Sequence, residues 1–156
     1  NSFYLKSADT GRCLTPTNTN TGCNSAHPKF QDGCSGNSKL FRALDKGGGN
    51  FLLRGVQMNI CLHPASGQPN SNHDVITYCG NGDGSDGCED DSRLYYKLVM
   101  RNDGSFLLKN PKYGFCVHPT NGYANAGRTI EFFDGCDTLK RLAFQAVFPS
   151  PPHCRA

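Results

Sequence analysis

Asn1-Ser-Phe-Tyr-Leu-Lys6, Gly49-Asn-Phe-Leu-Leu-Arg54 and Gly104-Ser-Phe-Leu-Leu-Lys109 are three segments that begin alike, and each predicts a β-strand. In all three, a cysteine follows the phenylalanine by ten residues. These cysteines open three further related segments, Cys13-Leu-Thr-Pro16, Cys61-Leu-His-Pro64 and Cys116-Val-His-Pro119. Three equal spacings indicate that one unit is repeated three times along the chain.

Each copy continues with a third and a fourth apolar segment. The third leads into an Asp-Gly-Cys triplet, and clear examples are Val75–Tyr78 and Ile130–Phe133. The fourth segments alternate in polarity and carry one aromatic residue in register, at Phe41 in 40–44, Tyr96 in 94–98 and Phe144 in 142–147. We therefore expect four strands per copy, with repeats over about 1–48, 49–103 and 104–148 and a tail over 149–156.

Length and composition favour one all-β domain. The chain has 156 residues, of which 37% are hydrophobic, while 18 are Gly and 9 are Pro, a balance typical of short strands joined by tight turns. The net charge of +3 is spread thinly, without the basic stripe of a nucleic-acid-binding protein. Apolar runs are far shorter than a membrane span needs, so no membrane insertion is expected.

Twelve short strands in three equivalent units favour closure around an axis. A single unit of this size cannot cover its own apolar face, and closure removes the exposed strand edges. The pattern resembles a β-trefoil, the fold of ricin B-type lectins, Kunitz-type soybean inhibitors, and the fibroblast growth factor and interleukin-1 cytokines. The prediction is an all-β, disulfide-stapled β-trefoil that spans nearly the whole chain.

Nine cysteines point to an oxidising compartment, and their spacing argues against zinc because no Cys-x-x-Cys pair occurs. Position 1 is not Met and no apolar leader is present, so we expect the mature form of a secreted protein. Symmetry between the copies predicts the disulfides Cys13–Cys34, Cys61–Cys88 and Cys116–Cys136. Three cysteines remain, Cys23, Cys79 and Cys154, and their pairing stays open. One internal pair would leave a thiol able to link two chains, so we expect a homodimer, with or without a disulfide link.

The absence of tryptophan separates this sequence from ordinary ricin B-type repeats, which carry a Gln-x-Trp element in the last strand. Gln145 of the third copy follows its aromatic residue instead. The tryptophan-free, cysteine-rich composition is similar to that of small calcium-dependent galactose-binding trefoil lectins of the AJLec type. That resemblance implies a protein that binds galactose-containing glycans and uses calcium as a cofactor.

Candidate sugar-binding residues lie in the second and third copies, at the Cys-[Leu/Val]-His-Pro step and after it. On this interpretation, His63 and His118 donate to sugar hydroxyl groups at the rim of a site. The simpler alternative is that Pro and Gly shape a turn and the histidine caps it. The candidate residues are His63, Pro64, Tyr78 and Asp90 in the second copy, and His118, Asn121, Glu131 and Asp134 in the third.

The second copy carries an acidic, glycine-rich insertion over 79–91. Alternating oxygen-bearing side chains with intervening glycines resemble part of a calcium-binding loop, since Ca²⁺ prefers several oxygen ligands on a flexible backbone. The candidate ligands are Asn81, Asp83, Ser85, Asp86 and Glu89. A full EF-hand loop is missing, and a solvated acidic turn is the alternative.

No enzymatic activity is expected. The carboxylates that a glycosidase would need, drawn from Glu89, Asp90 and Glu131, include two in a solvated acidic run, and no nucleophile elbow or phosphate-binding loop occurs. Trefoils also include protease inhibitors and cytokine-like receptor-binding proteins, and these stay open as alternatives to a lectin.

Overall fold

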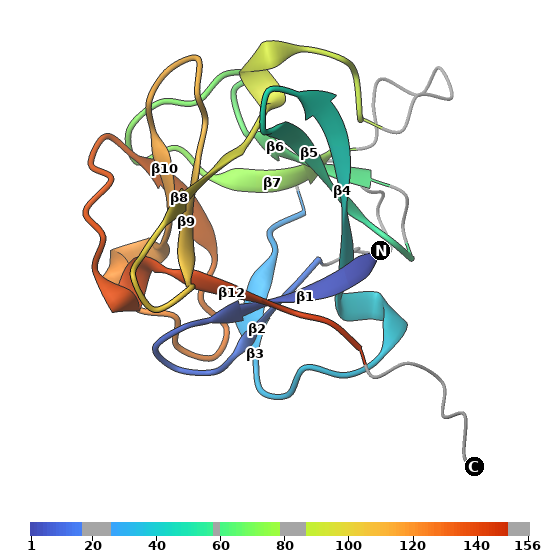
Figure 1. Ribbon diagram of the computed structural model, residues 1–156, viewed down its shortest axis with the longest axis vertical. Coiled ribbons are helices and arrows are strands. Elements are labelled where there is room, and N and C mark those ends of the chain that lie inside the picture. Colours follow the sequence, from blue (N-terminus) through green and yellow to red (C-terminus); the bar gives the residue numbers. More distant parts are fainter. Residues whose placement is uncertain (17–25, 58–59, 79–86, 150–156) are drawn as a thin grey trace.

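The computed structural model describes residues 1–16, 26–57, 60–78 and 87–149. Within these ranges the chain forms twelve β-strands, four short 3-10 helices and no α-helix (Figure 1). The strands are β1 (Ser2–Ser7), β2 (Cys13–Thr15), β3 (Lys29–Gln31), β4 (Leu40–Gly47), β5 (Asn50–Gly55), β6 (Ile60–Pro64), β7 (Val75–Tyr78), β8 (Lys97–Met100), β9 (Phe106–Lys109), β10 (Cys116–Pro119), β11 (Ile130–Phe133) and β12 (Phe144–Val147). The helices are η1 (Asn37–Lys39), η2 (Ser92–Leu94), η3 (Thr120–Gly122) and η4 (Lys140–Leu142).

Six of the strands close into a barrel. Strand β1 pairs with both β4 and β12, β4 pairs with β5, and β9 pairs with both β8 and β12, all antiparallel. An isolated bridge between Phe51 and Tyr96 joins β5 to the segment that enters β8, which completes the ring. Closure leaves no free barrel edge, so the strands do not offer a template for pairing with other chains.

The other six strands form three hairpins, one per copy, on one end of the barrel. They are β2–β3, β6–β7 and β10–β11. Neighbouring hairpins are held together by the bridges Ala26↔Thr77 and Asp74↔Glu131 and by the bond from the Phe30 amide to the Arg128 carbonyl. A six-stranded barrel with a triangular cap of three hairpins confirms the predicted fold class.

The core repeats with the strands. The aromatic residues predicted to be in register, Phe41, Tyr96 and Phe144, are all fully buried in one cluster. The leucines of the opening segments, Leu5, Leu53 and Leu108, belong to the same cluster. Tyr96 keeps a polar atom in this core, and its hydroxyl donates to the carbonyl of Leu62 at 3.4 Å; burial raises the pKa of this phenol.

The fourth strand of the second and third copies starts later than the sequence predicts. Leu94 and Leu142 end the 3-10 helices η2 and η4, and the strands begin at Lys97 and Phe144. Both leucines are buried, so apolar periodicity alone reads them as part of the strand that follows. The 3-10 turn satisfies the local backbone instead, with the Tyr95 amide donating to the Ser92 carbonyl and the Ala143 amide to the Lys140 carbonyl.

The three disulfides predicted from symmetry are confirmed: Cys13–Cys34, Cys61–Cys88 and Cys116–Cys136. Each ties the start of a hairpin to the segment that leaves it. The remaining cysteines, Cys23, Cys79 and Cys154, lie outside the described residues, as do the four predicted calcium ligands between 81 and 86. In the described part of the chain, no helix has the length and apolar character needed to cross a bilayer.

Candidate functional site

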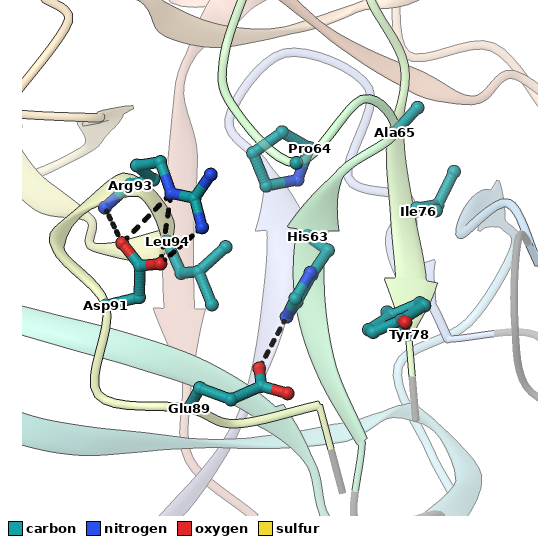
Figure 2. A pocket seen from close by; sticks show the side chains of 10 residues that line it. His63, Pro64, Ala65, Ile76, Tyr78, Glu89, Asp91, Arg93 and Leu94 are labelled. Carbon is teal, nitrogen blue, oxygen red and sulfur yellow. Dashed lines mark hydrogen bonds and ion pairs between the residues drawn. The ribbon is translucent and has the colours of Figure 1, made fainter. Parts of the chain in front are cut away.

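A cavity of about 450 Å³ opens in the second copy, between the end of β6, strand β7 and the segment that enters η2. His63 and Pro64 come from β6, Tyr78 from β7, and Glu89 from the described end of the acidic insertion. Figure 2 shows His63 between the Tyr78 ring on one side and the Glu89 carboxylate below. The structure therefore brings three of the sequence-predicted sugar residues together with one predicted calcium ligand.

His63 is buried in the wall of this cavity, with 8% of its surface exposed, rather than standing at the rim as the sequence suggested. It is the fourth residue of the wholly buried strand β6, which explains the difference. Its Nε2 atom contacts the carbonyl oxygen of Gly87, so this nitrogen carries the proton. Glu89 Oε2 lies 3.5 Å from the same nitrogen, and the Tyr78 ring centre is 4.8 Å from the imidazole centre.

Burial lowers the pKa of His63, and the Gly87 carbonyl and the Glu89 carboxylate only partly oppose this effect. The imidazole is therefore neutral at pH 7. A neutral ring with its proton on Nε2 keeps Nδ1 as a hydrogen-bond acceptor. The imidazole, a carboxylate and an aromatic ring thus line one cavity.

An ion pair on the opposite wall of the cavity limits what the remaining acidic side chains can do. Arg93 binds the Asp91 carboxylate through both Nε and Nη2, at 3.0 and 2.6 Å from Oδ2, and lowers the pKa of Asp91 to about 2 (Figure 2). Asp90 accepts a hydrogen bond from the Tyr95 hydroxyl and does not line the cavity, although the sequence had suggested it for sugar binding. Of the described acidic residues here, Glu89 alone lines the cavity without a bound arginine.

No group of three His, Cys, Asp or Glu side chains suited to hold a metal ion occurs among the described residues. Glu89 is the one predicted calcium ligand that the structure describes. Its carboxylate is half exposed and faces the cavity, so it fits an ion site as a single ligand. The other predicted ligands, Asn81, Asp83, Ser85 and Asp86, fall outside the described part of the chain.

A second cavity, of about 340 Å³, lies at the same place in the third copy. His118 and Pro119 of β10 correspond to His63 and Pro64, and Phe133 of β11 corresponds to Tyr78. Of the predicted residues, Asn121 and Glu131 also line it, whereas Asp134 is exposed and does not. Burial, together with the nearby Asp74, raises the pKa of Glu131.

The sequence did not point to the basic side chains of these cavities. Arg93 lines the first cavity and Arg141 lines the second. Both precede the buried leucine that ends a 3-10 helix, and Lys39 holds the same position before Leu40 in the first copy. Aligning the copies on these leucines is the signal that reveals the basic side chains, because a cation recurs one residue before each leucine.

Three solved structures of other proteins are similar to the chain over nearly its whole length. A designed threefold-symmetric protein, ThreeFoil, has a TM-score of 0.78 at 18% identity, covering 95% of this chain and 99% of its own. The ricin B-like lectin of Macrolepiota procera, solved with lactose, has a TM-score of 0.72 at 10% identity, covering 96% of both chains. The Rhizoctonia solani agglutinin has a TM-score of 0.71 at 12% identity, covering 94% of this chain and 93% of its own.

The chain is a β-trefoil. Identities this low establish the shared fold and leave the ligand to be argued from the cavities. No protein-family model matches the sequence, and no curated protein does.

Proposed function

We propose that the protein is a carbohydrate-binding lectin whose main site is the second-copy cavity lined by His63, Tyr78 and Glu89. The observation that carries this proposal is the convergence of a buried neutral imidazole, an aromatic ring and a half-exposed carboxylate in one cavity. Sugars need both kinds of surface, since their hydroxyl groups bond to polar side chains while their C–H faces pack on aromatic rings. The fold shared with two agglutinating or ricin B-like proteins adds support.

Galactose or a terminal β-galactoside is the ligand that we propose for this site. Glu89 accepts hydrogen bonds from hydroxyl groups of the sugar, which are stronger for being charge-assisted. His63 Nδ1 accepts another, and Tyr78 supports the apolar face of the ring. The Macrolepiota procera lectin, which shares the fold, was solved with lactose and supports a ligand of this class, and the AJLec-type resemblance suggests the same ligand.

Calcium is a separate part of the proposal. Two adjacent sugar hydroxyl groups would replace two waters on the ion, and Glu89 would act as one protein ligand with the others supplied from 81–86. Because Asp91 is neutralised by Arg93, the described residues give the ion little further negative charge. The acidic composition of the insertion is the support for calcium, and the chelator arm of the experiment below tests it independently of sugar binding.

Secretion and dimerisation complete the proposal. Three disulfides are consistent with an oxidising compartment. A pair of chains would present two copies of each cavity, and two weak sites on one particle bind glycan-rich surfaces far more tightly than one. We propose binding without catalysis, and no contact in the described residues favours a protease inhibitor or a cytokine-like ligand.

Isothermal titration with galactose, with and without a chelator, tests the function. The wild-type protein should bind galactose, and Glu89→Gln should weaken binding by about tenfold or more, the loss expected when a charge-assisted hydrogen bond is removed. Asp90→Asn serves as the matched control, because Asp90 is acidic, adjacent in sequence and outside the cavity. Equal affinity of Glu89→Gln and the wild type would rule out this cavity as the galactose site. Unchanged affinity in chelator would remove calcium from the proposal and leave the lectin intact.

A further inference from the structure

The cavity of the third copy differs from its counterpart in two ways that point to a different ligand. The first is a buried ring nitrogen without a partner. His118 is 6% exposed, and its Nε2 atom has no hydrogen-bond partner in the part of the chain that the structure describes. In the second copy, the corresponding nitrogen contacts the Gly87 carbonyl and the Glu89 carboxylate.

The third copy also has a shorter loop between its two bonded cysteines. The disulfide Cys116–Cys136 joins cysteines 20 residues apart, whereas Cys61–Cys88 joins cysteines 27 residues apart. The third copy therefore lacks the insertion of the second, although Gly135 and Asp137 flank Cys136 as Gly87 and Glu89 flank Cys88. A buried polar atom left unpaired is costly, and such atoms are usually satisfied by solvent or by a bound ligand. His118 Nε2 is thus prepared for a hydrogen bond that the described residues do not supply.

The second difference is apolar. Six large apolar side chains are exposed among the described residues, and two of them, Phe133 and Leu139, line the third-copy cavity, while none lines the second-copy cavity. Phe133 also stacks on His118, with ring centres 5.3 Å apart. The unpartnered nitrogen therefore lies next to an exposed apolar wall.

Arg141 fixes the polar side of the same cavity. Its Nη1 donates to the Gly122 carbonyl at 3.0 Å, and its guanidinium lies 4.8 Å from the centre of the Tyr123 ring. Glu131 and Asp137 also line the cavity, so two carboxyl groups face one guanidinium. An anionic ligand is therefore disfavoured, and a neutral ligand with hydrogen-bonding groups fits both the donors and the acceptors of the lining.

We propose that the third-copy cavity is a second sugar site, distinct in selectivity, which prefers an N-acetylated hexosamine such as N-acetylgalactosamine over galactose. An N-acetyl group carries a methyl group beside an amide. The methyl group packs against Leu139 and Phe133, while the amide bonds to His118 Nε2. Galactose can donate a hydroxyl group to His118 Nε2, but it has no methyl group and so leaves the apolar wall unused. This inference rests on the proposed lectin function, and it assigns a different ligand to a different cavity.

Amide chemical shifts of the ¹⁵N-labelled protein, titrated with N-acetylgalactosamine and with galactose, report on each cavity separately. Asn121, Gly122 and Leu139 report on the third copy, and Ala65, Gly67 and Leu94 on the second. N-acetylgalactosamine should move the third-copy signals and bind there about fourfold or more tightly than galactose, the ratio expected for one buried methyl group.

Two variants make the result specific. Leu139→Ser should abolish the preference for N-acetylgalactosamine, whereas Leu98→Ser should keep it, because Leu98 is equally exposed (43% against 45%) but lines neither sugar cavity. Both positions are on the surface, so both variants should fold. Silent third-copy signals, or equal affinity there for the two sugars, would overturn the inference. Silent second-copy signals with galactose would count against the main site alone.

Discussion

At the scale of single residues, burial decides what the two histidines can do. The Cys-[Leu/Val]-His-Pro step was visible in the sequence, and it led to both cavities. The burial of the two histidines could not be predicted from the sequence, because strands β6 and β10 are buried at every position and show no alternation. The histidines therefore form cavity walls rather than rims, and burial lowers the pKa of both.

The lowered pKa of His63 makes stability depend on pH. The unfolded chain binds a proton at this side chain more readily than the folded chain, so the free energy of unfolding is fully retained above about pH 6.5 and falls as pH decreases below it. Urea unfolding between pH 7.5 and 5 should show this decrease, and His63→Gln should reduce it. His73→Gln is the control, because His73 is exposed. Parallel pH profiles of the free energy of unfolding for the wild type and His63→Gln would show that His63 is not the source of the pH dependence.

At the scale of elements, repeat and alternation predicted most strands, but not the 3-10 helices between the third and fourth strands. Leu94 and Leu142 fit the strand pattern because both are buried, and apolar periodicity does not distinguish a buried turn from a buried strand. These turns matter for function, since they carry Arg93 and Arg141 into the cavities. Leu139, just before η4, was missed for a different reason, because it is exposed and lies outside every strand pattern.

Contact between η3 and η4 gives a testable consequence at Gly122. Its φ is +81°, and a Cβ atom there would collide with Arg141 Nη1. Gly122→Ala should therefore displace the guanidinium from the third-copy cavity and lower the free energy of unfolding by about 1–3 kcal/mol. Gly127→Ala is the matched control, with φ of +83° and open space around the new methyl group. Denaturant unfolding of both variants checks this, and equal losses would show that backbone strain alone accounts for the effect.

At the scale of the whole molecule, the threefold repeat fixed the barrel, the core aromatic residues and three disulfides. Symmetry could not fix the asymmetric parts. The insertion of the second copy and the pairing of the last three cysteines follow no repeat, so neither spacing nor register constrains them. The linings of the two cavities also differ because they include segments whose sequences differ between the second and third copies.

The odd cysteine predicts a covalent assembly, with Cys154 the candidate. Non-reducing electrophoresis should show a species of twice the monomer mass that collapses to about 17.0 kDa on reduction. Cys154→Ser should remove the larger species. Identical migration with and without reductant would exclude a disulfide-linked dimer, and light scattering would then establish whether a non-covalent one remains.

A crystal structure of the protein with lactose tests most directly the central claim that the second-copy cavity is a sugar site. The galactose ring is predicted to lie in the cavity between His63 and Glu89, with its apolar face against Tyr78 and a hydroxyl group within hydrogen-bond distance of the Glu89 carboxylate. Lactose bound elsewhere, with this cavity filled only by solvent at saturating sugar, would contradict the claim.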